Sequence, residues 1–184
     1  MRRRNLILAT AILFAVVLTM SGCKIVYSEA ELIEKIIGNT PLPPEEIALL
    51  SFHERYVIAN GEADNWAIRQ ETEVAELDRC EMFTLEYLPN GKVTLKTCHG
   101  LYITAPANGE NRKDRMLMQE LESGDCGQFY LYELGNNQVA LKTCAGNFLT
   151  AGDDGLGWEG ELRWAIVGET DILDDWEYFT IEKK

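Results

Sequence analysis

The chain has 184 residues, a formal net charge of −13, 46% hydrophobic residues and 9% aromatic residues. This length allows one well-buried domain with appendages, and the apolar content excludes an intrinsically disordered chain. The excess of acidic residues argues against a nucleic-acid partner, because phosphate binding needs a basic surface. The chain has two histidines, His53 and His99, which leaves little material for general-base catalysis or histidine metal sites.

Residues 1–22 have the pattern of a secretory signal peptide. Three arginines precede an apolar run from Leu6 to Met20, and two small residues separate this run from Cys23. The run is short for a transmembrane helix, which needs about 20 residues. The stretch from Met20 to Cys23 resembles the lipoprotein signal of bacteria, which implies that Cys23 is lipidated and becomes the new N-terminus. Ordinary secretion and an uncleaved anchor are the alternatives.

Cleavage of the signal would make the chain more acidic. Removing its three arginines leaves 14 of the 17 basic residues against 30 acidic ones, a net charge of −16. An anionic membrane surface does not attract such a chain, so acyl chains on Cys23, palmitate among them, would have to hold it there. We therefore expect a lipid-anchored protein of the bacterial cell envelope, with its domain outside the cytoplasm.

Residues 23–45 are predicted to be a spacer between the lipid and the domain. Ser28 is placed to cap a short helix that Gly38 would end. A proline-rich segment follows and would keep the chain extended. Alternatively, this helix docks onto the domain or onto a partner.

The strongest pattern in the chain is an internal repeat. Residues 80–105 align without a gap with residues 126–151, at an offset of 46, and 13 of the 26 positions are identical. A third copy is divided between the two ends of the domain. Residues 46–59 align with the second half of this unit, and residues 176–182 align with its start. Because the two ends complete one repeat, the three units are predicted to close into a ring.

Each unit of about 46 residues is predicted to contain four short strands, since apolar residues alternate on either side of turn residues. Residues 46–184 should therefore form an all-β domain, a β-trefoil with pseudo-threefold symmetry that the N- and C-terminal strands close. The recurring aromatic-Leu-x-Ala, Glu-x-Phe and Asn-Gly-Lys-Val-x-Leu-Lys-Thr motifs resemble the fascin-like branch of β-trefoils. The Gln-x-Trp signature of ricin-type lectins is not present. The actin cross-linkers of the fascin-like family use several trefoils together, so actin is not expected as a partner here.

Four cysteines lie in the repeats, and they are predicted to form two disulfides. They are Cys80, Cys98, Cys126 and Cys144. The members of each pair lie symmetrically about a hairpin turn, which favours Cys80–Cys98 and Cys126–Cys144, each worth roughly 3 kcal/mol. In the divided repeat the equivalent positions are Trp176 and Phe52, where an aromatic contact is expected. Free thiols and a zinc site are the alternatives, although zinc fits poorly without a C-x-x-C pair.

Histidines and tryptophans that recur between repeats are predicted to be structural. His53 and His99 occupy equivalent positions and should be turn or surface residues rather than members of a Ser-His-Asp group. Trp66 and Trp164 recur within a second repeated segment and are predicted to lie in the core. No catalytic residue, metal or cofactor is predicted, so the chain is not expected to be an enzyme.

A ligand is expected where the repeats diverge, in the loops Asn60–Asn65, Pro106–Asp114 and Gly152–Glu161. The candidate ligand-binding residues are Trp158, Asp153, Asp154, Asn108 and Arg112. Trp158 would stack on a sugar ring or anchor a protein, unless it folds back to plug the trefoil. The paired aspartates could hold Ca²⁺, although they lack the EF-hand spacing.

These observations predict a non-catalytic, membrane-tethered binding module that recognises a glycan or a protein at the cell surface. The alternative is a structural or assembly lipoprotein of an envelope complex, with no small-molecule ligand.

Overall fold

The computed structural model describes residues 42–62, 66–71, 80–107, 111–153, 155 and 163–183. The chain divides into two compact units, and all the described residues belong to the second, Asn39–Lys184. The predicted signal peptide, Cys23 and the spacer up to residue 41 lie outside the described residues. Among the described residues, no helix is long and apolar enough to cross a membrane.

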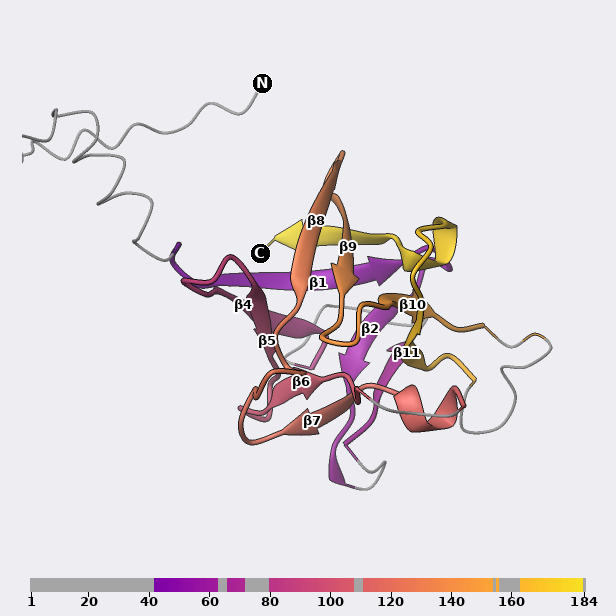
Figure 1. Cartoon of the computed structure of the whole chain (residues 1–184), viewed down its shortest axis with the longest axis horizontal. Helices are drawn as coiled ribbons and strands as arrows, with labels where there is room; N and C mark the ends of the chain where they lie inside the picture. The colour runs from indigo at the N-terminus through magenta and orange to yellow at the C-terminus, as the bar shows by residue number, and fades with distance from the viewer. Residues whose placement is uncertain are drawn as a thin grey trace, which may run out of the picture. The chain divides into compact units, whose positions relative to one another are not determined.

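The described residues form strands joined by turns, with two short 3₁₀ turns (Figure 1). The strands are β1 (Glu45–Ser51), β2 (Tyr56–Ala59), β3 (Ile68–Glu71), β4 (Met82–Tyr87), β5 (Val93–Lys96), β6 (Tyr102–Thr104), β7 (Met118–Glu120), β8 (Tyr130–Gly135), β9 (Gln138–Lys142), β10 (Phe148–Ala151), β11 (Ile166–Thr170) and β12 (Phe179–Lys183). The 3₁₀ turns are η2 (Lys113–Arg115) and η4 (Asp175–Glu177). All 12 strands belong to one hydrogen-bonded sheet, which confirms the all-β prediction.

Six of these strands close a barrel. β1 pairs with β12 on one side and with β4 on the other, and the pairs β4–β5, β8–β9 and β9–β12 continue the ring. β5 and β8 meet at Val93 and Phe129, which exchange two backbone hydrogen bonds of 2.9 Å. The strands from the two ends of the domain, β1 and β12, thus complete the barrel as the divided repeat predicts.

The other six strands form three hairpins that cap the barrel: β2–β3, β6–β7 and β10–β11. The backbones of Ile68, Leu117 and Ile166 join these hairpins. Ile68 N donates to Leu117 O at 3.2 Å, and Leu117 N donates to Ile166 O at 2.9 Å. A six-stranded barrel capped by three hairpins is a β-trefoil, so this prediction is also confirmed.

The inward sides of the repeats supply equivalent core residues. Phe83, Phe129 and Phe179 have exposed fractions of 0%, 0% and 1%, and each is preceded or followed by outward polar positions. Alternation with period two places such residues on one side of a strand. Burying each phenylalanine stabilises the fold by about 1.5–3 kcal/mol, which explains why the repeats share these positions.

Two buried glutamines fix the stems of predicted ligand loops. Gln70 Nε2 donates to Gly152 O at 2.7 Å, and Gln119 Nε2 donates to Asn60 O at 2.7 Å. Gly152 and Asn60 are the first residues of two of the three divergent loops. Each bond crosses from one repeat to another, so these loops start from positions that neighbouring repeats hold.

Candidate functional site

Both predicted disulfides are present. Cys80 pairs with Cys98 at a Cα–Cα separation of 5.0 Å, and Cys126 pairs with Cys144 at 5.1 Å. Ligand atoms of Cys80, Cys98 and His99 lie within 4.8 Å of one another. Because both sulfurs are in a disulfide, neither is a thiolate that could ligate zinc. This group is therefore a structural clasp rather than a metal centre.

The two histidines bridge neighbouring repeats. His53 Nε2 lies 3.0 Å from the carbonyl oxygen of Ala151, and His99 Nε2 lies 3.1 Å from that of Ala59. Ala151 and Ala59 are the last residues of β10 and β2. Each imidazole therefore donates to the end of a cap strand in another repeat, which is a structural role.

Each histidine also packs edge-to-face against a tryptophan. The ring centroids are 5.3 Å apart for Trp66 and His99, and 5.9 Å apart for His53 and Trp164. The prediction that these tryptophans lie in the core is wrong, because both are half-buried at the boundaries between repeats. Both also have a φ of 57°, a left-handed conformation that is uncommon for a bulky residue.

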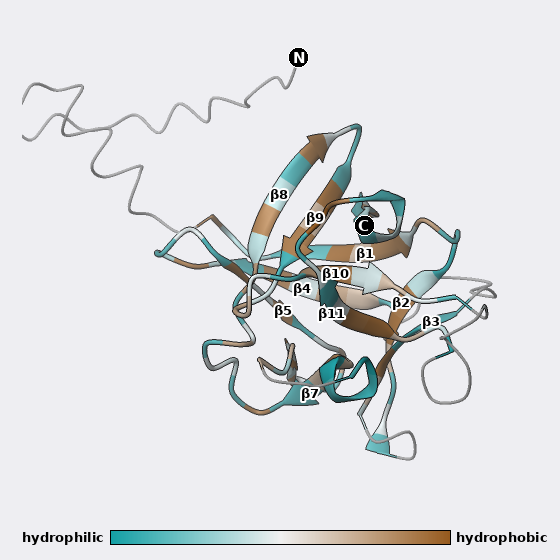
Figure 2. Ribbon diagram, turned by 45° about the vertical axis from the view of Figure 1, so that its right-hand side comes forward, coloured by the Kyte–Doolittle hydropathy of each residue, from teal (hydrophilic) through white to brown (hydrophobic). Residues whose placement is uncertain are grey.

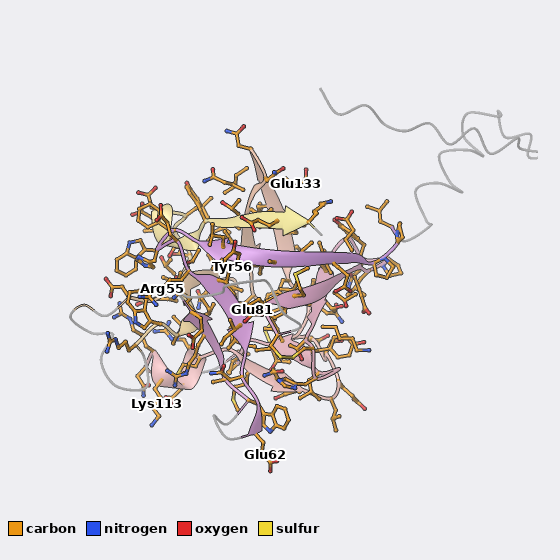
Figure 3. The ribbon with its side chains drawn as sticks, turned by 180° about the vertical axis from the view of Figure 1, so that it is seen from behind. Arg55, Tyr56, Glu62, Glu81, Lys113 and Glu133 are labelled. Atoms are coloured by element: carbon orange, nitrogen blue, oxygen red, sulfur yellow. A yellow bond between two sulfur atoms is a disulfide. The ribbon has the colours of Figure 1, made fainter. Side chains whose placement is uncertain are left out.

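Five side chains gather where the third repeat meets the first. The members of this junction cluster are Phe52, His53, Arg55, Trp164 and Trp176. His53 lies 5.1 Å from Trp176 and 5.7 Å from Phe52 between ring centroids, so both residues at the cysteine-equivalent positions contact this histidine. The Arg55 guanidinium carbon lies 3.4 Å from the centroid of Trp164. Arg55 directly precedes β2 in the chain and is labelled in Figure 3.

The predicted ligand loop Gly152–Glu161 begins beside this cluster. Asp153 O accepts a hydrogen bond of 3.2 Å from the backbone nitrogen of Trp164. The Asp153 carboxylate accepts one of 2.8 Å from Gly155 N, so it stabilises its own turn. Asp154 and Trp158 lie outside the described residues.

Arg112 lies elsewhere in the domain. Arg112 directly precedes η2, and its Nε forms an ion pair with Glu169 on β11. Asp153 is hydrogen-bonded to Trp164, which lies just before the start of β11, whereas Glu169 lies near the end of β11. Five residues of strand span roughly 15 Å. The candidate residues Asp153 and Arg112 therefore do not form one site, and Asn108 lies outside the described residues.

Glu177 follows Trp176 of the junction cluster in the chain, and its carboxyl group is buried, with an exposed fraction of 2%. Thr150 Oγ1 donates to Glu177 Oε1 at 2.7 Å, and the backbone nitrogen of Asp174 donates to Oε2 at 2.8 Å. Burial raises the pKa of Glu177, while these hydrogen bonds oppose the rise. With Asp174 it forms a capping box on η4, so its role is structural.

Tyr130 and Tyr132 on β8 did not feature among the candidate residues, yet they are exposed by 47% and 44%. Their positions correspond to Thr84 and Glu86 on β4. A three-way alignment reveals them, because the divided repeat also has Thr and Glu at these positions. Figure 2 shows hydrophobic bands along β8 as far as its tip, where Leu134 is 39% exposed.

No family model matches the chain, and no curated protein matches it in sequence. Solved structures do resemble it. The BEL β-trefoil is 13% identical with a TM-score of 0.60, covering 79% of this chain and 97% of that one. The Macrolepiota procera ricin B-like lectin, solved with lactose, is 12% identical with a TM-score of 0.60, covering 79% and 100%. SeviL, solved with asialo-GM1 saccharide, is 10% identical with a TM-score of 0.56, covering 77% and 98%. At such identities the likeness establishes the fold, and the chain is similar to β-trefoil proteins.

Proposed function

We propose that this protein is a non-catalytic, membrane-tethered module that binds a glycan at the cell surface. Two of the structural neighbours, the Macrolepiota procera lectin and SeviL, were solved with saccharides, which supports this choice of ligand. A shared fold does not by itself transfer a ligand, because binding sites are built from particular side chains. The proposal therefore depends on the junction cluster.

The junction cluster has the chemistry that a sugar site needs. A sugar ring offers apolar C–H groups to an aromatic surface and hydroxyl groups to fixed polar partners. Phe52 is 51% exposed, and Trp164 is half-buried. Stacking on Trp164 holds the Arg55 guanidinium, whose donors suit hydroxyl oxygens. The segment between Asp153 and Trp164 contains Trp158, and we include this candidate residue in the proposed site.

Tethering through Cys23 is a separate part of the proposal, supported by the signal pattern of residues 1–22. Lipidation there would hold the domain outside the cytoplasm on a bacterial membrane. The two disulfides fit such an oxidising compartment. We also infer from the repeated motifs that the domain is akin to the fascin-like trefoils.

A glycan array probed with the full-length protein in detergent tests the proposed ligand class. We expect binding to neutral saccharides such as lactose, and a loss of at least about tenfold in Arg55→Ala and in Trp158→Ala. Leu101 occupies the position of Arg55 in the second repeat. Leu101→Ala is therefore the matched control and should bind as the wild type does. If no glycan is bound, the proposal fails and the structural or assembly lipoprotein becomes the better interpretation.

The anchor is tested in bacteria that express the whole chain. Mass spectrometry of the membrane-purified protein should find acyl chains on an N-terminal Cys23, and Cys23→Ala should move the protein out of the membrane fraction. An unmodified Cys23 in the mature protein would contradict the tethering proposal.

A further inference from the structure

The outward side of β8 differs from the equivalent sides of β4 and β12. In β4 and β12 the outward residues are threonine and glutamate, and Thr84, Glu86 and Glu182 form hydrogen bonds with neighbouring strands. Thr84 Oγ1 donates to Glu46 at 2.7 Å, and Tyr56 OH donates to Glu182 at 2.9 Å. In β8 the same two positions are Tyr130 and Tyr132, both exposed. Solvent-exposed rings where polar side chains would suffice indicate a contact with something outside the domain.

Two lysines accompany these tyrosines. Lys92 Nζ lies 4.9 Å from the ring centroid of Tyr130, and Lys142 Nζ lies 4.7 Å from that of Phe148. Tyr132 packs edge-to-face on Phe148 at 5.6 Å, and Tyr130 lies opposite Lys142 in the β8–β9 register. We call these five residues the tyrosine face. Its ammonium groups are held beside aromatic rings by cation–π attraction.

The charge of the tyrosine face also differs from that of its counterparts. Lys92 corresponds to Glu46 in the first repeat, and Tyr132 corresponds to Glu86 and Glu182. The ring of Tyr132 thus lies where both other repeats have a carboxylate, and the Lys92 ammonium group lies where the first repeat has a carboxylate and the third an amide, Gln138. In a chain with a net charge of −13, this local excess of ammonium groups suits an anionic ligand.

Amide groups lie beside Lys92 and hold its backbone. Asn90 Nδ2 donates to Gln128 Oε1 at 2.9 Å, and Lys92 N donates to Asn90 Oδ1 at 3.1 Å. These bonds tie the β4–β5 turn to the segment that leads into β8. The face therefore combines rings, ammonium groups and amides on two hairpins with fixed backbones.

We propose that the tyrosine face is a second carbohydrate site and that its ligand is an oligosaccharide containing a carboxylate sugar, such as a uronic or sialic acid. This inference rests on the proposed function, that the domain binds glycans. Tyr130 and Tyr132 contact the C–H faces of the sugar rings, and Lys92 and Lys142 pair with the carboxylate. The site is separate from the junction cluster, since Glu133 of β8 and Arg55 lie on different parts of the domain in Figure 3.

Calorimetric titration of the full-length protein in detergent tests this site with oligogalacturonate, sialyllactose and lactose as probes. We expect at least one acidic probe to bind, and its affinity to fall when sodium chloride is raised, because salt screens the lysine–carboxylate attraction. Replacing Tyr130→Thr and Tyr132→Glu together introduces the residues of the other two repeats. This double variant should weaken acidic-probe binding at least about tenfold, since stacked aromatic contacts contribute about that much.

A matched pair of lysine variants separates the site from a general charge effect. Lys96 Nζ lies 5.5 Å from the Tyr102 ring, at the position in the second repeat that corresponds to Lys142 and Phe148. Lys142→Gln should weaken binding of the acidic probe several-fold, and Lys96→Gln should leave it unchanged. Circular dichroism and thermal unfolding verify that each variant is folded.

The outcomes are distinct. Acidic-probe binding that depends on the tyrosines and on Lys142 supports the inference. Binding of glycans that is equally strong in the double variant and in Lys142→Gln overturns it and leaves the proposed function standing. Binding of lactose alone, or capture of a protein through Tyr130 and Tyr132 with no acidic probe bound, also overturns it. No glycan binding at all overturns both proposals.

Discussion

The hairpins β4–β5 and β8–β9 are two versions of one sequence with different outer surfaces. Both have a disulfide between residues 18 apart, and both insert a fully buried phenylalanine, Phe83 or Phe129, into the barrel. Their outward residues differ, because Thr84 and Glu86 form hydrogen bonds with neighbours whereas Tyr130 and Tyr132 are exposed. The inward side thus determines the fold, and the outward side can change without disturbing it.

The largest expected effect is on the shared inward side. Phe83→Ala and Phe129→Ala should each lower the free energy of unfolding by about 3–5 kcal/mol, because each removes a fully buried ring from the barrel. Chemical denaturation of both variants measures this. A cost for Phe129→Ala below about 1 kcal/mol would mean that the second hairpin does not share the core in the way described.

The disulfides should rank next. Replacing either cysteine pair with serine should cost about 3 kcal/mol, and the two pairs should cost nearly the same because each closes a loop of the same 18-residue separation. Thermal unfolding of the two double variants compares them. Alkylation followed by non-reducing mass spectrometry is the control, and four reactive thiols in the folded wild type would contradict the pairing.

The outward side should affect stability much less. Tyr130→Thr with Tyr132→Glu should change the free energy of unfolding by less than about 1 kcal/mol, because both rings are exposed by more than two-fifths. Denaturation midpoints of the wild type and the double variant measure the difference. A loss as large as that of Phe129→Ala would assign the tyrosines to the fold rather than to binding.

The divided repeat has no disulfide, unlike the hairpins β4–β5 and β8–β9, but it contains the buried carboxyl group of Glu177, which should make stability depend on pH. Its pKa is raised from the ordinary 4.5 by burial, so the folded state binds the proton more tightly than the unfolded state does. As pH rises from the acid side through 4.5, ionisation therefore lowers the stability relative to a chain without this carboxyl. Glu177→Gln, which cannot ionise, should remove this component from the stability–pH profile. Parallel profiles for the wild type and Glu177→Gln would contradict the assignment.

The internal repeat predicts much of the fold, but it does not predict the candidate site. Particular residues show why. The offset of 46 predicted the barrel closure and the cysteine pairs, since both depend on positions that the repeats share. The half-buried, left-handed conformation of Trp66 and Trp164 depends on how repeats meet, which no single repeat encodes. Asp153 and Arg112 both lie at divergent loops, but the length of β11 separates them.

Tyr130 and Tyr132 were missed for a different reason. They lie within a strand, whereas the predicted ligand site lies in the loops where the repeats diverge. In a comparison of two repeats, their replacement of Thr84 and Glu86 is one difference among several. The third repeat supplies the contrast, because Thr180 and Glu182 agree with β4 against β8. Outward positions of a strand can thus diverge as freely as a loop.

The central claim is that the ligand binds to outward side chains that differ between the repeats, while the inward side chains that the repeats share form the fold. Side-chain NMR of the full-length protein, labelled at tyrosine and tryptophan and titrated with oligogalacturonate, tests it most directly. We predict that the ring signals of Tyr130 and Tyr132 shift with increasing probe, while those of Trp66 and of Tyr102, the counterpart of Phe148, stay in place. Shifts confined to Trp66 and Tyr102, with Tyr130 and Tyr132 unchanged, would contradict the account.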